Sequence, residues 1–405
     1  DPVSAIYGDD WDEINIVAGT GAGKSTMLEI MMSYDVTFGS FDILYATQND
    51  GNAASFSRDR LQPTLERTLS TKDLMFSLKD KDKTREAIKF PHMMIHTVGA
   101  NMSSFQEISV QKVLNDECWC WNANNLIGES RKRLHDRADG KLINVSQAGS
   151  EDGKGSEWYG QAKRGKRMDY GWSCTCGVHN KWDFDNIVFD IEYVESEEGE
   201  EESSVINWAK TLDDVRLCCP TCYKTYQDNP TDRRELLDSS TFIDADNNHF
   251  PRVITYFIHS LAFPKIRWSK VVGEFLLANE SLKQGNINPL LQLKNKVFSE
   301  FTKQNSRDID ASPLTLSDYW KRDVVEPQEG YKRIMTCDVQ GGGDSDQYYW
   351  AVIRDWDREG SGDSKLVFES MVADKEQILE IAKKYKVQPT RLFLDSGYET
   401  EVVLE

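Results

Sequence analysis

The 405-residue sequence contains no signal peptide and no apolar run approaching the roughly 18 residues of a membrane-spanning helix. Cysteine is also sparse. Eight cysteines in a chain of this length are too few for a disulfide framework. Four or five of them lie in two tight clusters, which indicates metal binding in a reducing compartment. We therefore expect a soluble, intracellular protein that makes no contact with a membrane.

Positive charge is the minority sign. The sequence has 48 Lys and Arg against 67 Asp and Glu, a formal net charge of −19, which argues against indiscriminate nucleic-acid binding. The charge is unevenly spread, since residues 195–202 form an acidic run typical of a solvated loop. Basic clusters at 131–133 and 163–167 leave room for a local DNA track.

The most informative motif is a glycine-rich stretch at residues 18–25, Ala-Gly-Thr-Gly-Ala-Gly-Lys-Ser, between an apolar run and a helix-like segment. This is the strand, loop and helix context of a P-loop, in which backbone N–H groups cradle phosphate oxygens. Lys24 is expected to reach the β- and γ-phosphates of ATP, and the Ser25 hydroxyl to hold Mg²⁺. The expected nucleotide-binding residues are Gly19, Gly21, Gly23, Lys24, Ser25 and Thr26. Ala18 replaces the usual first glycine, and a Gly-rich turn without nucleotide is the alternative interpretation.

An apolar segment at 110–114 leads through Asn115 to Asp116 and Glu117. P-loop ATPases hold Mg²⁺ with an Asp at such a strand end and activate water with the adjacent Glu. We assign Asp116 to the metal and Glu117 to the catalytic base, with a merely polar strand end as the alternative. Ser146 and Gln147 follow the next strand and are candidates for sensing the γ-phosphate, although a simple turn explains them nearly as well.

Two cysteine clusters provide zinc ligands. Cys174 and Cys176 form the first, and the second contains Cys219 and Cys222 in a Cys-Pro-x-Cys turn. Four thiolates suit a tetrahedral structural Zn²⁺ and leave no open position for catalysis. The first pair has an irregular one-residue spacing, so His179 is an alternative ligand, and free or buried cysteines remain a further interpretation.

A second acidic site involves Asp338, within a predicted strand, and Asp395, at the end of a later one. Carboxylates on adjacent strands can hold two metal ions, Mg²⁺ or Mn²⁺, that activate water and stabilise a leaving oxygen. Asp346, in the Gly-rich turn after the first strand, is a possible helper. The alternative is that both aspartates are turn caps.

The alternation of strands and helices predicts an α/β fold with a parallel sheet. The motifs described above predict its parts: a P-loop ATPase domain, a cysteine-rich zinc-binding insert and a truncated RNase H-like nuclease domain. The predicted strands of the first part lie at 12–17, 41–46, 93–97, 110–114 and 142–146, and residues 70–87 are expected to be a surface excursion. The predicted domains are the ATPase at 1–160, the cysteine-rich insert at 161–240, a connecting segment at 241–325 and the nuclease at 326–405. Because the chain begins at Asp1 and ends at Glu405, directly after a predicted strand, we expect the last domain to be incomplete.

In this order, the motifs resemble the large terminase subunit of tailed phages, in its lambda-type, GpA-like branch. Segments around 45–63, 98–101 and 256–264 are also similar to that family. The resemblance implies an ATP-driven motor that translocates double-stranded DNA into a procapsid and a metal-dependent endonuclease that cuts concatemeric DNA. It implies catalysis by Glu117, Asp338 and Asp395, and action in the host cytoplasm. The implied partners are the portal protein, the procapsid, a small terminase subunit and further copies in a ring.

Two other functions fit parts of the sequence. A DNA helicase or remodelling ATPase with a zinc module would separate strands but leave Asp338 and Asp395 without a role. A nucleotide-gated assembly protein would turn over little ATP. The arginine finger expected of such an ATPase is not identified by the sequence. Its candidates are Arg58, Arg60, Arg131 and Arg133.

Overall fold

The computed structural model describes residues 1–106, 108–121, 125–153, 155–194, 206–245, 249–303, 331–340, 348–357, 364–372 and 375–394. The chain divides into two compact units, Asp1–Asp308 and Ile309–Glu405. No helix within the described part of the chain is long and apolar enough to cross a membrane.

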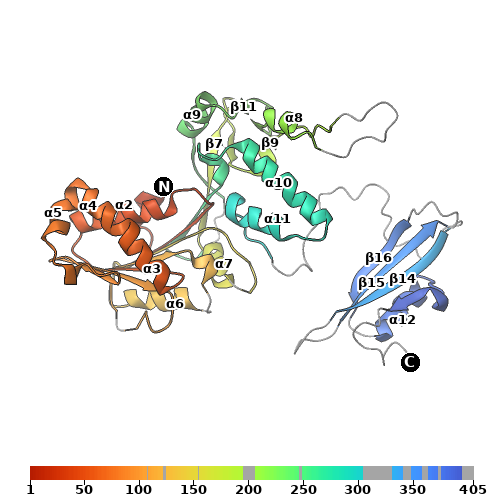
Figure 1. Ribbon diagram of the computed structural model, residues 1–405, viewed down its shortest axis with the longest axis horizontal. Helices are drawn as coiled ribbons and strands as arrows, with labels where there is room; N and C mark the ends of the chain where they lie inside the picture. Colours follow the sequence, from red (N-terminus) through yellow and green to blue (C-terminus); the bar gives the residue numbers. More distant parts are fainter. Residues whose placement is uncertain are drawn as a thin grey trace. The chain divides into compact units, whose positions relative to one another are not determined.

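The first unit is built on a ten-stranded sheet with the order β12-β7-β13-β1-β6-β5-β2-β4-β3, to which β8 is added beside β7 (Figure 1). The pairs from β7 through β13, β1, β6, β5 and β2 to β4 are parallel. The strands are β1 (Glu13–Ala18), β2 (Ile43–Thr47), β3 (Ala87–Lys89), β4 (Met94–Gly99), β5 (Lys112–Asp116), β6 (Lys141–Ser146), β7 (Lys166–Ser173), β8 (His179–Lys181), β12 (Thr241–Asp244) and β13 (Val253–Ile258).

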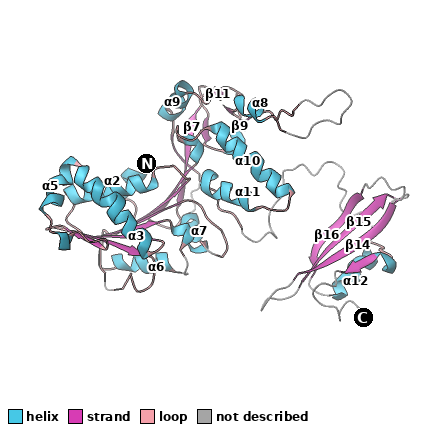
Figure 2. Cartoon of the chain, in the orientation of Figure 1, coloured by secondary structure: helices cyan, strands magenta, loops and turns pink. Residues whose placement is uncertain are grey.

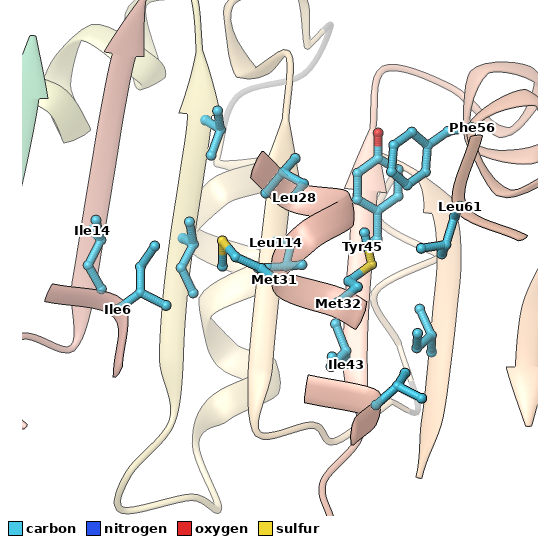
Figure 3. Packing of buried hydrophobic residues seen from close by; sticks show 14 of the residues in the cluster. Ile6, Ile14, Leu28, Met31, Met32, Ile43, Tyr45, Phe56, Leu61 and Leu114 are labelled. Atoms are coloured by element: carbon cyan, nitrogen blue, oxygen red, sulfur yellow. The ribbon is translucent and has the colours of Figure 1, made fainter. Parts of the chain in front are cut away.

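Helices cover both faces of this sheet because its central strands are buried on both faces along their length. One face packs on α1 (Pro2–Tyr7), α2 (Lys24–Phe38), α4 (Gln62–Arg67) and α5 (Leu69–Ser77), and Figure 3 shows Leu28, Met31 and Met32 of α2 lying over it. The other face packs on α6 (Leu126–Arg131) and α7 (Ser156–Arg164). Helix α3 (Asp50–Phe56) and the π-helical turn η1 (Ser57–Leu61) continue from β2 towards α4.

A row of buried polar side chains crosses the middle of the sheet. Asn15, Asn144 and Asn115 stand in register on β1, β6 and β5. Asn144 donates to Asn15 over 2.8 Å, and Asn115 donates to Asn144 over 2.8 Å. All three side chains are buried, so a shift of register would leave amides without partners, which is costly. The row therefore fixes the alignment that brings the ends of β1 and β5 to the same edge.

The cysteine-rich region adds a small sheet of order β11-β10-β9 beside the main one. Its strands and helices are β9 (Ile187–Val188), β10 (Arg216–Cys218), β11 (Thr225–Gln227), α8 (Trp208–Asp213) and α9 (Pro230–Asp238). The chain then returns through β13 to α10 (Trp268–Lys283), α11 (Asn288–Leu293) and the π-helical turn η7 (Lys294–Phe298).

The second unit is a four-stranded sheet of order β16-β15-β14-β17 with one helix (Figure 2). Its elements are β14 (Tyr331–Gln340), β15 (Tyr348–Asp357), β16 (Ser364–Val372), α12 (Lys375–Lys384) and β17 (Leu392–Leu394). Strands β14 and β17 are parallel, whereas β14, β15 and β16 are antiparallel. Buried Arg333 makes a two-bond ion pair with Asp355, at 2.7 Å for each bond, and donates to the backbone of Tyr385 after α12.

Two features differ from the sequence-based expectations. Residues 69–77 form α5, whose Met75 is buried in the main core, because Thr71 and Met75 supply an inward face within a charged segment. The main sheet also crosses the boundaries predicted at residues 160 and 240. Strands β7 and β12 lie in it, and β13, predicted within a connecting segment, pairs with β1.

Candidate functional site

The glycine-rich stretch joins β1 to α2 at the carboxyl edge of the main sheet. Gly21 and Gly23 have φ angles of 81° and 75°, values that side-chain-bearing residues rarely adopt. The first α2 bond runs from the N–H of Met27 to the carbonyl of Gly23, at 2.9 Å. The N–H groups of Lys24, Ser25 and Thr26 therefore precede every intrahelical acceptor, which is the condition for anion binding at a helix N-terminus.

Lys24 lies between the loop and the acidic pair. Its Nζ donates to the carbonyls of Ala18 and Gly19, at 3.0 and 3.1 Å. Burial lowers the pKa of the Lys24 ammonium, and the negative charges of Glu117 and Asp116 oppose that shift. The structure thus brings the predicted phosphate-binding lysine into the field of both predicted catalytic carboxylates.

Asp116 ends β5 in a buried position. Its carboxylate accepts from the hydroxyl of Tyr45 at 2.9 Å and from the N–H of Glu117 at 3.0 Å. Desolvation, together with the charge of Glu117, raises the pKa of Asp116 to about 6. A divalent cation placed against this carboxylate would favour its ionised form.

Glu117 is held by the backbone and by one indole. It adopts a left-handed conformation with φ 53°, and its N–H also donates to the carbonyl of Val145 at 3.0 Å. Trp119 Nε1 donates to Glu117 Oε2 at 2.7 Å, and the Trp119 N–H donates to Ser146 Oγ at 3.1 Å. A non-glycine residue in this conformation stores strain, a feature that is common at active sites.

The candidate sensor residues lie next to this group. Ser146 ends β6, the strand between β1 and β5, and its hydroxyl is the acceptor for Trp119. Gln147 is buried, and its backbone carbonyl accepts from Trp158 Nε1 at 2.9 Å. Ser146 is therefore connected to Glu117 through one tryptophan.

The arginine candidates are distributed over the unit. Arg131 binds Glu13 at 2.8 Å, at the start of β1 and hence at the edge opposite the glycine-rich loop. Arg60 pairs with Glu29 at 2.6 Å, and Arg58 pairs with Asp59 in an exposed position at 2.7 Å. The Arg133 Nε is buried without a partner.

The four predicted zinc ligands converge. The sulfur atoms of Cys174, Cys176, Cys219 and Cys222 all lie within 4.8 Å of one another, which no other group of potential ligands among the described residues achieves. The distances are 3.5 Å for Cys174–Cys222 and 3.9 Å for Cys176–Cys219. Four sulfurs at about 2.3 Å from a zinc ion form a tetrahedron with edges of roughly 3.8 Å, so the thiols fit that metal.

Tyr226 and His179 lie near the thiol cluster, and their hydrogen bonds show how each relates to it. The hydroxyl of Tyr226 donates to Cys174 Sγ at 3.5 Å, a contact expected of a thiolate acceptor. His179, the alternative ligand, is bound through Nδ1 to Ser173 Oγ at 2.7 Å and is not part of the cluster. Cys174 and Cys176 lie in the turn between β7 and β8, and both of their sulfur atoms reach the cluster despite the one-residue spacing.

The second acidic site is described only in part. Asp338 lies exposed on β14, opposite Trp350 of β15. On the other side of β14, the parallel strand β17 places Leu394 beside Cys337. Asp395 and Asp346 lie outside the described residues, as does the acidic run at 195–202.

Sequence reasoning missed the residues that hold the predicted ones. Tyr45, Trp119 and Ser260, whose hydroxyl donates to the Thr20 carbonyl, reach the site from three separate segments. Tyr45 and Ser260 lie in segments that resemble the expected family, but the resemblance gave them no role. A compositional signal was also present, since a tyrosine inside a buried strand and a tryptophan after the acidic pair need partners for their polar atoms.

Comparison with known proteins agrees with the expected family. The family described as phage terminase large subunit gpA, ATPase domain, matches residues 1–237. Solved structures that resemble the chain include the large terminase ATPase domain of Thermus phage P74-26, with 11% identity, a TM-score of 0.38, and coverage of 75% of this chain and 93% of that one. The HK97 bacteriophage large terminase has 12% identity, a TM-score of 0.39, and coverage of 97% and 68%. None of the curated proteins matches.

Proposed function

Because this chain belongs to the gpA-type family of phage terminase large subunits, we propose that it is an ATP-driven motor that translocates double-stranded DNA into a procapsid. One observation carries the proposal beyond family membership. Lys24 on the glycine-rich loop lies in the field of Asp116 and Glu117 at the same edge of the sheet. A strand-separating helicase is the weaker candidate because the family is one of terminases.

In the proposed ATPase site, the loop holds the phosphates of ATP. Backbone N–H groups from Gly19, Gly21 and Gly23 to Thr26, with the Lys24 ammonium, bind phosphate oxygens. Ser25 and Asp116 would hold Mg²⁺, which would neutralise charge on the phosphates. Lys24 then exchanges the carbonyls of Ala18 and Gly19 for phosphate oxygens.

Glu117 is the proposed general base that orients the attacking water. The indole of Trp119 fixes one carboxylate oxygen, which leaves the other oxygen for the water. Ser146 positions Trp119 and so has an indirect route to the base. These groups supply orientation and electrostatics, which carry most of the catalysis in phosphoryl transfer.

The cysteine cluster is proposed to hold one structural Zn²⁺ through Cys174, Cys176, Cys219 and Cys222. The sulfur spacing supports this assignment, and four protein ligands exclude a catalytic zinc. We propose that the residues of the ATPase chemistry lie in the first 160 residues and the zinc ligands at 161–240. Strands from 161–240 and from the segment at 241–325 nevertheless complete the main sheet.

Residues 326–405 are proposed to be part of an RNase H-like endonuclease that cuts concatemeric DNA. Asp338 and Asp395 are its proposed metal ligands, for Mg²⁺ or Mn²⁺, with Asp346 as a helper. The parallel pairing of β14 with β17, whose last residue directly precedes Asp395 in the sequence, supports a shared site. The proposed partners are DNA, the portal protein, the procapsid, a small terminase subunit and further copies in a ring.

ATP turnover by the full-length protein, with and without double-stranded DNA, tests the motor. We expect turnover that DNA stimulates, without strand separation of a forked duplex. Negligible turnover under both conditions would contradict the motor and favour a nucleotide-gated assembly protein. Strand separation would favour the helicase.

Plasmid cleavage with Mg²⁺ or Mn²⁺ tests the nuclease independently. Cutting should be lost in Asp395→Ala and kept in Asp355→Asn, although the latter loses the ion pair to Arg333 and must be checked for folding. Cutting that ignores Asp395 would remove the nuclease assignment and leave the ATPase proposal intact.

A further inference from the structure

Two segments that are distant in sequence make hydrogen bonds to the glycine-rich loop. The Gly19 N–H donates to the carbonyl of Ile258 at 3.1 Å, and the Thr20 N–H donates to the carbonyl of Lys296 at 2.6 Å. Ser260 Oγ donates to the Thr20 carbonyl at 3.1 Å. The first two residues of the loop are therefore fixed by the start of the segment 258–266 and by η7, and we call this segment and η7 together the bracket.

The contact between loop and bracket is tight. A Cβ atom placed on Gly19 would lie 2.0 Å from Ser260 Oγ and 2.9 Å from the Val297 carbonyl oxygen. A Cβ on Gly21 would lie 3.2 Å from the side chain of Ile266. Glycine at position 19 is thus required by the bracket as well as by phosphate binding.

The bracket is in turn anchored by one buried cation. Arg233 of α9 donates to the carbonyl of Leu261 at 2.6 Å and to the carbonyl of Ile266 at 2.7 Å. It also pairs with Asp228 at 2.9 Å and lies 4.0 Å over the ring of Trp268. The residue is only 3% exposed, so its charge is compensated mainly by these partners and not by water.

Helix α9 belongs to the cysteine-rich region. It contacts β11, whose Tyr226 bonds to Cys174, and Leu236 of α9 shares one buried cluster with Cys174, Cys219, Leu261 and Trp268. A continuous set of contacts therefore leads from the thiol cluster through Arg233 and the bracket to the loop.

We infer that Arg233 and Ser260 are positioning residues for the P-loop, through which the cysteine-rich region sets the affinity of the site for nucleotide. Arg233 holds residues 261–266, and Ser260 passes that restraint to Thr20. Neither residue is among those proposed to bind nucleotide. The inference rests on the proposed ATP binding by this loop.

The test is a titration of the full-length protein with a fluorescent ATP analogue, using Arg233→Lys, Ser260→Ala and Arg234→Ala. Lysine keeps the positive charge, but its compact ammonium lacks the planar fork with which the guanidinium reaches Asp228 and two carbonyls from separate nitrogens. We expect about a tenfold loss of affinity in Arg233→Lys and a smaller loss in Ser260→Ala. Arg234 is the control because it is the next residue of the same helix. Its side chain is 83% exposed and pairs with Asp238 at the surface, so Arg234→Ala should bind the analogue as the wild type does.

A rescue experiment separates positioning from folding. Gly19→Ala should bind the analogue weakly, and adding Ser260→Ala should restore part of the affinity because it removes the atom 2.0 Å from the new methyl group. Urea unfolding midpoints for every variant show which of them fold normally.

The outcomes are distinguishable. Wild-type affinity in a folded Arg233→Lys protein, or strictly additive losses in the double variant, would overturn the inference alone. A wild-type protein that does not bind the analogue would overturn the proposed ATP site and the inference with it.

Discussion

The glycine-rich loop and the cysteine cluster were both recognised from short motifs, yet their side chains are satisfied in different ways. At the loop, the functional groups already have partners within the chain: Lys24 has two carbonyls, Asp116 has Tyr45, and Glu117 has Trp119. At the cluster, four sulfurs converge mainly on one another. The first site is organised by the polypeptide, whereas the second is proposed to be organised around a metal ion.

The largest expected effect is that of metal removal. Zinc sites of this kind contribute about 10–16 kcal/mol of apparent binding free energy, which is coupled to folding. Cys219→Ser, at a buried ligand, should therefore abolish metal binding and unfold the cysteine-rich region. Elemental analysis and limited proteolysis measure both effects.

The neighbouring cysteine supplies the control. Cys218→Ser changes a half-buried thiol outside the cluster and should keep one zinc per chain. If Cys219→Ser retained metal and protease resistance, the cluster would be organised by the polypeptide after all, and the contrast with the loop would disappear.

The next effect concerns the loop itself. Lys24→Ala removes the ammonium next to Asp116 and Glu117, and we expect ATP turnover to fall by at least about 10²–10³-fold. The unfolding midpoint should change little, because the neighbouring backbone carbonyls can bind water instead. Normal turnover in this variant would remove the P-loop assignment, and a collapsed fold would show that Lys24 is structural.

An intermediate effect is expected on the pH dependence of the unfolding free energy, through His259 on the bracket that connects the two regions. Burial lowers the pKa of this imidazole to about 3, below its usual 6.5. The unfolded chain then binds a proton that the folded chain does not, so stability present above pH 6.5 is lost as the pH falls towards 3. At pH 5 the loss should be of order 1–2 kcal/mol.

His259→Asn tests this expectation. Asparagine can still accept the Leu261 N–H that His259 Nδ1 now accepts at 3.1 Å, but it does not titrate. The difference in unfolding free energy between pH 7 and pH 5 should therefore be smaller in the variant than in wild type. Equal differences would assign the acid sensitivity to other groups.

The smallest effect should come from Trp119→Phe, which removes the 2.7 Å bond to Glu117 and keeps an aromatic ring. A hydrogen bond to a charged group contributes about 1.5 kcal/mol, so kcat should fall about tenfold while KM changes little. An unchanged kcat would mean that the backbone alone positions Glu117.

The sequence predicted what depends on local pattern. The alternation of apolar runs located β1, β2, β4, β5 and β6 within a few residues, and the motif residues Lys24, Asp116 and Glu117 meet as expected. The four cysteines also converge despite their irregular spacing.

What the sequence could not provide depends on long-range packing. The placement of β13 beside β1 and the grip of Ser260 on Thr20 join residues about 240 positions apart, which no local pattern records. Asn115, which interrupted an apolar strand, is explained by partners on β6 and on α6. A buried polar residue of this kind signals a partner without identifying it.

The left-handed backbone of Glu117 has a consequence for how this protein would respond to selection. Glycine or asparagine would occupy φ 53° at lower cost, so replacing Glu117 by either should raise the melting temperature while removing the proposed base. A library sorted only for heat resistance would thus be enriched in inactive variants at this position. Retention of glutamate there would itself report that turnover had been selected.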